Sequence, residues 1–170
     1  MARDRRRGAE AGTPALRVLA EAGTAHTAHP YPHADGESRF GDEAVRALRA
    51  QGVDVTPERA LKTLLTDVDG RLVVAVVPVA STLDLKALAA AAGGKRATLA
   101  DPARAQRASG YVLGGISPLG QRTRLPTVVD ASALTHATVL VSGGRRGLQV
   151  ELAPADLVAL TDAVTAPVAR

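Results

Sequence analysis

The chain has 170 residues, enough for one domain with a sizeable core, and its 46% hydrophobic content is ordinary for a globular protein. Aromatic residues make up only 2%, which disfavours proteins that bind nucleic acid by stacking many bases on exposed rings. The absence of cysteine excludes disulfides, a cysteine nucleophile and thiolate metal sites, and the net charge of +4 weakly favours a polyanionic partner.

Part of the positive charge lies in the first 12 residues, MARDRRRGAEAG, where four arginines outnumber two acidic residues. We expect residues 1–12 to be a disordered, solubilising leader and residues 13–170 to form a single domain. The leader lacks the apolar segment of a secretory signal, and no apolar run reaches the roughly 18–20 residues of a membrane span. The sequence therefore predicts a soluble, cytoplasmic protein.

The first expected element is a helix at 13–23, because Thr13 can cap it, a proline follows in the first turn and a glycine suits its end. The segment AHTAHPYPH, at 25–33, is expected to be extended because of its prolines. A second amphipathic helix is predicted at 41–52 from apolar residues on one side and charges on the other.

Residues 60–79 predict a β-hairpin, because two apolar runs flank Asp69-Gly70, a strong signal for a tight turn. The second run, Leu72 to Val77, is apolar at every position. This pattern is typical of a strand that is buried on both faces.

The rest of the chain mixes helices and strands without a regular βαβ rhythm. The expected elements are helices at 82–94, 99–110 and 153–164, a strand at 126–131 and a second hairpin at 136–153. Two hairpins favour an α/β (α+β) fold, with a mixed, largely antiparallel sheet or a partial barrel flanked by helices. The stretch GGISPLG lacks the G-x-G-x-x-G spacing of dinucleotide-binding folds.

Lys62 lies inside an apolar strand, ALKTLL. A lysine at the centre of a strand must reach water, an anion or a pocket. Its position is compatible with an exposed side chain that extends to solvent, or with an anion-binding role.

His26, His29 and His33 surround Tyr31 in the same extended segment. Their spacings of three and four residues in a chain broken by prolines do not bring the rings together, so the sequence predicts no metal site. Tyr31 is interpreted either as a wall of a binding site or as a core residue.

Two glycine-rich stretches, GYVLGGISPLG at 110–120 and VSGGRRG at 141–147, could let other groups approach the backbone closely. The second is either a plain hairpin turn or a wall whose N–H groups or hydroxyl meet a ligand. Arg145 and Arg146 at its tip either contact phosphates or are solvated. No G-x-S-x-G motif is present, which disfavours a serine hydrolase.

Six segments, in this order and spacing, resemble the YbaK/EbsC family, and specifically its Cys-tRNA(Pro) deacylases of YbaK type. They are TPALRVL, FGDEAV, LKTLL, VAVVPVASTLDLKALA, ADPARAQRASGYVLGGISPLGQRTRLPTVVDA and VSGGRRGLQVELAPADL. The resemblance spans roughly residues 13–165, and the combination of GGISPLGQ with SGGRRG is its most specific part.

The resemblance implies a trans-editing enzyme that hydrolyses cysteine from mischarged tRNA(Pro). Prolyl-tRNA synthetase makes this error because cysteine and proline are similar in size, and a size-excluding pocket separates such groups poorly. The family is thought to use the thiol of the substrate as nucleophile, while the protein supplies positioning and electrostatics. The resemblance implies no cofactor or metal; the expected partners are tRNA(Pro) and prolyl-tRNA synthetase, with no membrane or DNA.

Carried over by position, the resemblance implies that Lys62 contacts the terminal phosphate or ribose. Gly114 and Gly115 would come close to the aminoacyl ester and offer N–H donors to its carbonyl. Tyr31 and Phe40 correspond to pocket aromatics. The other expected substrate-binding residues are Ile116, Ser117, Pro118, Ser142, Gly143 and Gly144.

Gln149, in GLQVEL, stands where relatives of YbaK type often carry aspartate. The glutamine keeps a hydrogen-bonding amide but loses the charge, which could shift substrate preference or rate. Two alternatives remain open: a non-catalytic module that binds tRNA or a synthetase, and a deacylase for another amino acid, such as alanine or serine.

Overall fold

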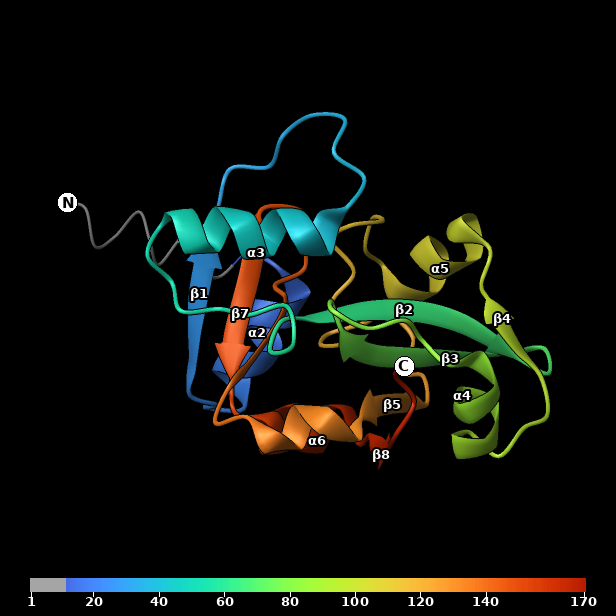
Figure 1. The fold of residues 1–170 in the computed structure, drawn as a ribbon. Helices are drawn as coiled ribbons and strands as arrows, with labels where there is room; N and C mark the ends of the chain where they lie inside the picture. The colour runs from blue at the N-terminus through green and yellow to red at the C-terminus, as the bar shows by residue number, and fades with distance from the viewer. Residues whose placement is uncertain (1–11) are drawn as a thin grey trace.

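The computed structural model describes residues 12–170 and shows helices and strands in mixed order (Figure 1). Residues 1–11 of the expected leader lie outside the described residues. The helices are α2 (Pro14–Glu21), α3 (Phe40–Ala50), α4 (Leu85–Ala91), α5 (Pro102–Ser109), α6 (Pro154–Thr161) and the 3-10 helix η1 (Ala131–Thr135). The strands are β1 (His26–Pro30), β2 (Leu61–Val68), β3 (Arg71–Pro78), β4 (Ala97–Leu99), β5 (Thr127–Asp130), β6 (Val139–Ser142), β7 (Leu148–Leu152) and β8 (Val164–Ala166).

Side-chain caps begin several of the helices, as short polar residues do. Thr13 and Asp101 cap α2 and α5 as predicted, and Asp84 caps α4; each accepts a hydrogen bond from the N–H three residues later, at 3.0 to 3.2 Å. Helix α3 differs, because the residue at its N-cap is Arg39, whose side chain makes no capping bond.

The strands form two open sheets. The larger has the order β4-β2-β3-β5-β8 and the smaller the order β1-β7-β6. Neighbouring strands are antiparallel except for the pairs β3–β5 and β5–β8, so the predicted mixed architecture is confirmed. Where the sequence predicts one sheet or a partial barrel, a single bridge between Ala60 and Leu140 joins two separate sheets.

Both predicted hairpins are confirmed. Asp69 and Gly70 join β2 to β3 with φ of +50° and +89°, the left-handed values that a two-residue hairpin turn requires. Residues 143–147 connect β6 to β7 in a longer turn. Strands β4 and β8 were not predicted, because each has three residues and pairs at a sheet edge without a periodic pattern of its own.

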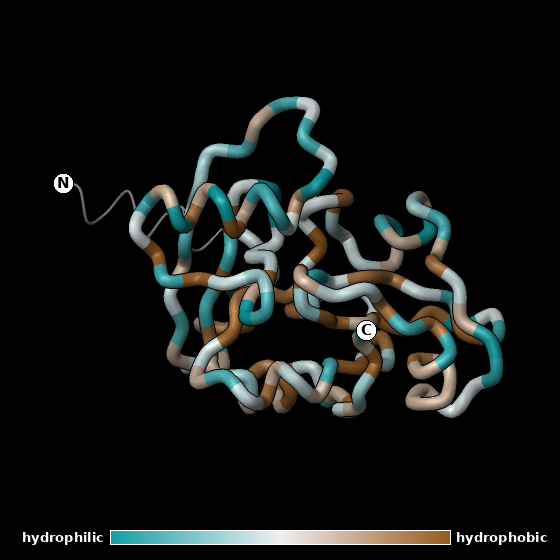
Figure 2. Tube along the Cα trace, viewed as in Figure 1, coloured by the Kyte–Doolittle hydropathy of each residue, from teal (hydrophilic) through white to brown (hydrophobic). Residues whose placement is uncertain are grey.

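Strand β3 is buried on both faces, as predicted. Val74 and Val76 face a core cluster that fills the space between the two sheets and includes residues of α2 and α6. Val73, Ala75 and Val77 face a second cluster beneath α4. Figure 2 shows the hydrophobic segments gathered in the interior along β3 and β5.

A third core cluster attaches α3 to the smaller sheet. Tyr31 and Leu140 pack there with Val45 and Leu48 of the helix. This contact fixes where α3 begins, which is one side of the site described below. None of the helices in residues 12–170 is long and apolar enough to cross a membrane.

Candidate active site

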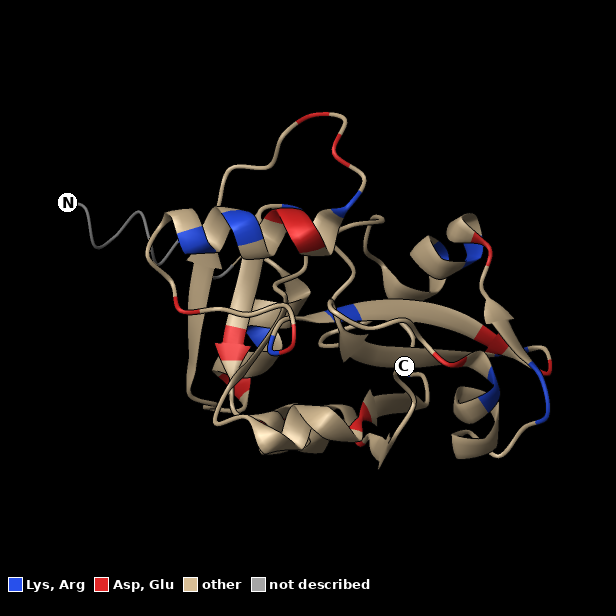
Figure 3. Ribbon diagram, viewed as in Figure 1, with Lys and Arg blue, Asp and Glu red and all other residues tan. Residues whose placement is uncertain are grey.

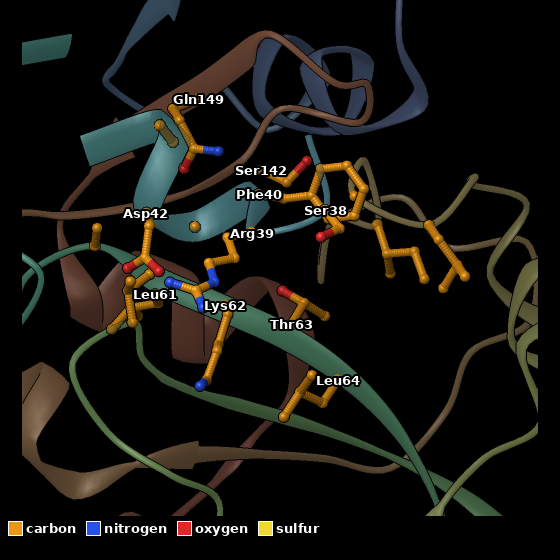
Figure 4. Close-up of a pocket in the computed structure, with 17 residues that line it drawn as sticks. Ser38, Arg39, Phe40, Asp42, Leu61, Lys62, Thr63, Leu64, Ser142 and Gln149 are labelled. Atoms are coloured by element: carbon orange, nitrogen blue, oxygen red, sulfur yellow. The ribbon is translucent and has the colours of Figure 1, made fainter. Parts of the chain in front are cut away.

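A cavity of about 410 Å³ lies between the first turn of α3, the start of β2 and residues 113–116 (Figure 4). Phe40, Lys62, Gly114, Ile116 and Ser142, which the sequence analysis singled out, are among the residues that line it. These residues come from four separate segments of the chain, so tertiary structure alone brings them together.

The first half of β2 leaves one edge open to this cavity, because β4 pairs only with Thr66–Val68 among the described residues. Lys62 Nζ donates to the carbonyl oxygen of Ser81 at 2.7 Å. Since an ammonium group has three protons, two remain for a ligand. Lys62 is thus partly buried in the cavity wall and not simply extended into solvent.

Several polar groups at the cavity have no partner in the described part of the chain. Thr63 Oγ1 is buried and makes no hydrogen bond there, and Figure 4 shows it on the side of Ser38 and Phe40. The first N–H groups of α3 also lack intrahelical acceptors, and the positive end of the helix dipole lies here. With Arg39 and Lys62, the lining offers donors and positive charge, which suits phosphate and ester oxygens.

Asp42 is the one carboxylate in the lining formed by residues 12–170. Arg39, Asp42 and Thr63 were not singled out from the sequence. Asp42 has the pattern of an ordinary first-turn acid of a helix, and Arg39 and Thr63 carry no signal beyond adjacency to Phe40 and Lys62.

Ser142 and Gln149 form another part of the cavity wall. They are paired residues of the neighbouring strands β6 and β7. Ser142 Oγ accepts the N–H of Gly144 at 3.2 Å. Tyr31 is only 7% exposed and packs in the core below α3, outside the lining. Burial raises the pKa of Tyr31, and hydrogen bonding with the Gln149 side chain opposes this rise.

Phe40 connects the segments around the cavity. The guanidinium carbon of Arg146 lies 4.9 Å from the ring centroid, and the ring of His33 lies 5.9 Å away. A Cβ on Gly114 would come within 2.6 Å of the Phe40 ring, and Gly114 has a φ of +83°. Only glycine fits this wall.

Gly115 allows the loop 110–120 to pack closely against the β6–β7 turn. A Cβ there would lie 2.8 Å from Arg145 Cα, so the segment 110–120 touches the backbone of the β6–β7 turn. The N–H of Gly115 already donates to the carbonyl of Val112 at 2.9 Å. It is therefore not a free donor for an ester carbonyl, contrary to the expectation.

The other two glycines of the predicted site also pack against protein. A Cβ on Gly143 would lie 2.5 Å from the Leu148 side chain, and one on Gly144 would lie 2.9 Å from the Tyr111 ring. Neither lines the cavity. Their small size lets the turn close onto the core.

Ser117 and Pro118 are buried and also lie outside the cavity lining. Ser117 Oγ accepts the N–H of Leu119 at 3.2 Å, and Pro118 borders a separate hollow near α2 and α6. Of Ile116, Ser117 and Pro118, only Ile116 lines the cavity.

The three histidines of the extended segment do not converge. His26 Nδ1 bonds with the Thr24 carbonyl, His29 with Glu151, and His33 with Glu43, at 2.6 to 2.8 Å. Within residues 12–170, no group of three or more metal-ligating side chains comes together. Each ring thus fixes local structure.

The sequence of this chain is similar to a known protein family and to individual known proteins. Residues 42–160 match the aminoacyl-tRNA editing domain family. "Putative Cys-tRNA(Pro)/Cys-tRNA(Cys) deacylase EbsC" of Enterococcus faecalis is 34% identical over 137 residues, which cover 79% of this chain and 83% of that protein. A 68-residue stretch, 40% of this chain, is 37% identical to 12% of a proline–tRNA ligase of Moorella thermoacetica.

Solved structures share the fold. One described as "Crystal structure of a putative trans-editing enzyme for prolyl tRNA synthetase" superposes with a TM-score of 0.75 at 24% identity, over 92% of each chain. A hypothetical protein superposes with a TM-score of 0.78 at 25% identity, over 92% of this chain and 99% of its own. Together with the extent of the sequence matches, these findings confirm the resemblance: the chain belongs to the aminoacyl-tRNA editing domain family.

Proposed function

We propose that this protein is a trans-editing enzyme that hydrolyses cysteine from mischarged tRNA(Pro). The family assignment and the deacylase relative support this activity. The observation that carries it is the cavity at the open edge of β2, where donors and positive charge meet without a protein nucleophile.

The 3′ end of the tRNA would enter this cavity. Lys62 and the first turn of α3 would hold the terminal phosphate, because ammonium and helix N–H groups both favour an anion. The buried Thr63 hydroxyl, which has no partner among residues 12–170, would bond to the ribose or the ester. These contacts would leave the aminoacyl group facing Ser142 and Gln149.

The lining offers no activated nucleophile in the part of the chain that the structure describes. The sequence has no cysteine, and no histidine borders the cavity. Ser142 Oγ accepts a backbone N–H and has no base beside it within those residues. This supports a mechanism in which the nucleophile comes from the substrate or from water.

A cysteinyl ester carries its own nucleophile. Its sulfur, after losing a proton to solvent, attacks the ester carbonyl carbon and forms a C–S bond in a four-membered thiolactone ring. The C–O bond to the ribose breaks, and the ribose oxygen takes a proton from water. Water then opens the thiolactone to free cysteine. Holding the sulfur near the carbonyl and placing donors at the developing oxyanion are the tasks left to the protein.

Gln149 bears on which amino acid is removed. Its amide can donate to and accept from the aminoacyl group but supplies no charge for the α-ammonium. Alanine and serine esters would fit the same space but lack the thiol. A Gln149→Asp variant should tighten binding of the α-ammonium and lower KM.

The modest net charge predicts weak binding of tRNA and a strong dependence on salt. A deacylase with little affinity for the tRNA body would also attack correct Cys-tRNA(Cys). Delivery of the substrate by prolyl-tRNA synthetase would avoid the hydrolysis of correct Cys-tRNA(Cys). We therefore propose that synthetase as a partner.

The deciding experiment is a deacylation assay of the purified protein on Cys-tRNA(Pro), Cys-tRNA(Cys), Ala-tRNA(Pro) and Pro-tRNA(Pro). Selective loss of cysteine is expected and would support the thiol mechanism. Equal rates for the cysteine and alanine esters would refute that mechanism. No release from any substrate would overturn the enzymatic assignment in favour of a binding module.

A further inference from the structure

The two arginines at the tip of the β6–β7 turn have different surroundings. Arg146 Nε donates to the Leu113 carbonyl at 2.7 Å, and its guanidinium lies over the Phe40 ring. The Arg145 guanidinium bonds only to the carbonyl of Arg146, at 3.3 Å, in the described part of the chain. Both side chains are exposed, so burial does not explain the difference.

The contacts of Arg146 end on two walls of the cavity. Phe40 begins α3, and Leu113 and Gly114 belong to the loop before β5; all three line the cavity. Gly114 also lies against the Phe40 ring, and Gly115 lies against the backbone of the arginine turn. Arg146 thereby closes a ring of contacts among three segments that are distant in sequence.

We propose that Arg146 is a positioning residue, which holds the Leu113–Gly114 wall against Phe40 and so fixes the shape of the cavity. It does not line the cavity itself. Its effect on catalysis rests on the function proposed above, whereas its effect on the wall does not.

The chemistry of arginine suits this task. A guanidinium is planar and can lie over an aromatic ring while its Nε donates, in the plane of the guanidinium, to a carbonyl. A lysine keeps the charge but has a single terminal ammonium and cannot make both contacts in the same way. Arg146→Lys therefore separates the loss of geometry from the loss of charge.

Amide hydrogen exchange tests the wall directly, without substrate. Arg146→Ala should accelerate exchange over residues 112–116 about tenfold, because it releases the loop that contains the Gly115–Val112 hydrogen bond. Arg145→Ala is the matched control, with the same loss of charge one residue away, and should leave this exchange unchanged. Equal exchange in both variants would overturn the proposal.

Kinetics test the consequence for catalysis. On cysteinyl-adenosine, which lacks the tRNA body, Arg146→Ala should lower kcat about tenfold, and Arg145→Ala should have no effect. Arg146→Lys should stay close to Arg146→Ala in kcat; full activity of the lysine variant would show that charge alone matters and would refute the positioning role.

The two experiments separate the two proposals. If the unmodified protein cleaves none of the substrates, the proposed function fails, yet faster exchange in Arg146→Ala alone would still establish the contact. A thermal unfolding midpoint within a few degrees of the unmodified protein shows that a variant is folded. If Arg146→Ala does not fold, Arg146→Lys, which keeps the charge, is measured by exchange in its place.

Discussion

The two ends of strand β2 use their polar groups in opposite ways. At the end that turns into β3, Asp69 accepts the backbone N–H groups of Lys95 and Arg96 at 2.7 and 3.0 Å. Asp67 pairs with Arg104, whose hydrogen bond holds the pKa of the Asp67 carboxyl below its ordinary value. Figure 3 shows acidic and basic residues alternating around this end.

At the other end, polar groups are left for something else. Thr63 Oγ1 is buried without a partner among residues 12–170, α3 begins without a side-chain cap, and Lys62 keeps two of its protons free. Native proteins rarely leave buried polar groups unsatisfied without a reason. The difference agrees with the proposal that one end of the strand serves stability and the other binds the substrate.

The largest effect is expected for Lys62→Met. It removes the cation of the cavity wall, so kcat/KM for Cys-tRNA(Pro) should fall at least about 100-fold, while the free energy of unfolding in urea changes by less than about 1 kcal/mol. Lys86→Met, at an exposed position of α4, is the control and should keep full activity. Normal activity of Lys62→Met would remove this lysine from the site.

Two glycine substitutions compare the cavity end of β2, where Gly115 lies in a neighbouring loop, with the turn end, where Gly70 lies. Gly115→Ala places a methyl group 2.8 Å from backbone and should lower the free energy of unfolding by about 2–3 kcal/mol and also reduce activity. Gly70→Ala meets no atom within 4 Å but must keep a φ of +89°, so it should cost about 1 kcal/mol and leave activity unchanged. Equal effects on activity would contradict the comparison.

Asp69→Ala tests the turn end alone. It removes the acceptor of two backbone N–H groups and should lower the free energy of unfolding by about 1–2 kcal/mol. Deacylation of Cys-tRNA(Pro) by the folded variant should remain at the unmodified rate. A drop in kcat would mean that the two ends are coupled.

The smallest effect concerns Tyr111, which lies beneath Gly144 at the cavity end. Burial raises its pKa to about 12, and its hydroxyl donates to the Leu119 carbonyl at 2.6 Å. The unfolded chain loses this proton near pH 10, before the folded one does. The contribution of Tyr111 to stability is therefore present in full below pH 10 and is lost as pH rises from 10 towards 12.

At pH 11 the fall should amount to about 1 kcal/mol in the free energy of unfolding. Tyr111→Phe cannot titrate and should show a smaller loss between pH 8 and pH 11, measured in urea. An identical loss in both proteins would show that other groups account for it.

Much of the fold could be predicted locally. Thr13 and Asp101 cap helices by side-chain chemistry, Asp69-Gly70 makes a tight turn because both residues accept a positive φ, and the apolar run of β3 predicts burial on both faces. The split into two sheets was missed, because the pairing of β1 with β7 joins residues more than a hundred positions apart. No local pattern records such a contact.

Some residues of the candidate site could be predicted from the sequence, and others could not. Lys62 and Phe40 carried signals in the sequence, a charge in an apolar strand and one of few aromatics, and both line the cavity. Arg39, Asp42 and Thr63 could not be found, because their residue types are ordinary at those positions and only the meeting of α3 with β2 gives them a role.

The glycines of residues 110–120 and 141–147 show what could and could not be predicted from the sequence. The sequence by itself determined that residues 110–120 and 141–147 allow a close approach, because a residue without Cβ permits it. Only the tertiary structure decided what approaches: the Phe40 ring at Gly114, the Arg145 backbone at Gly115 and the Tyr111 ring at Gly144. The physical reason is that a missing side chain specifies free volume, and the neighbour that fills the volume is set by long-range packing.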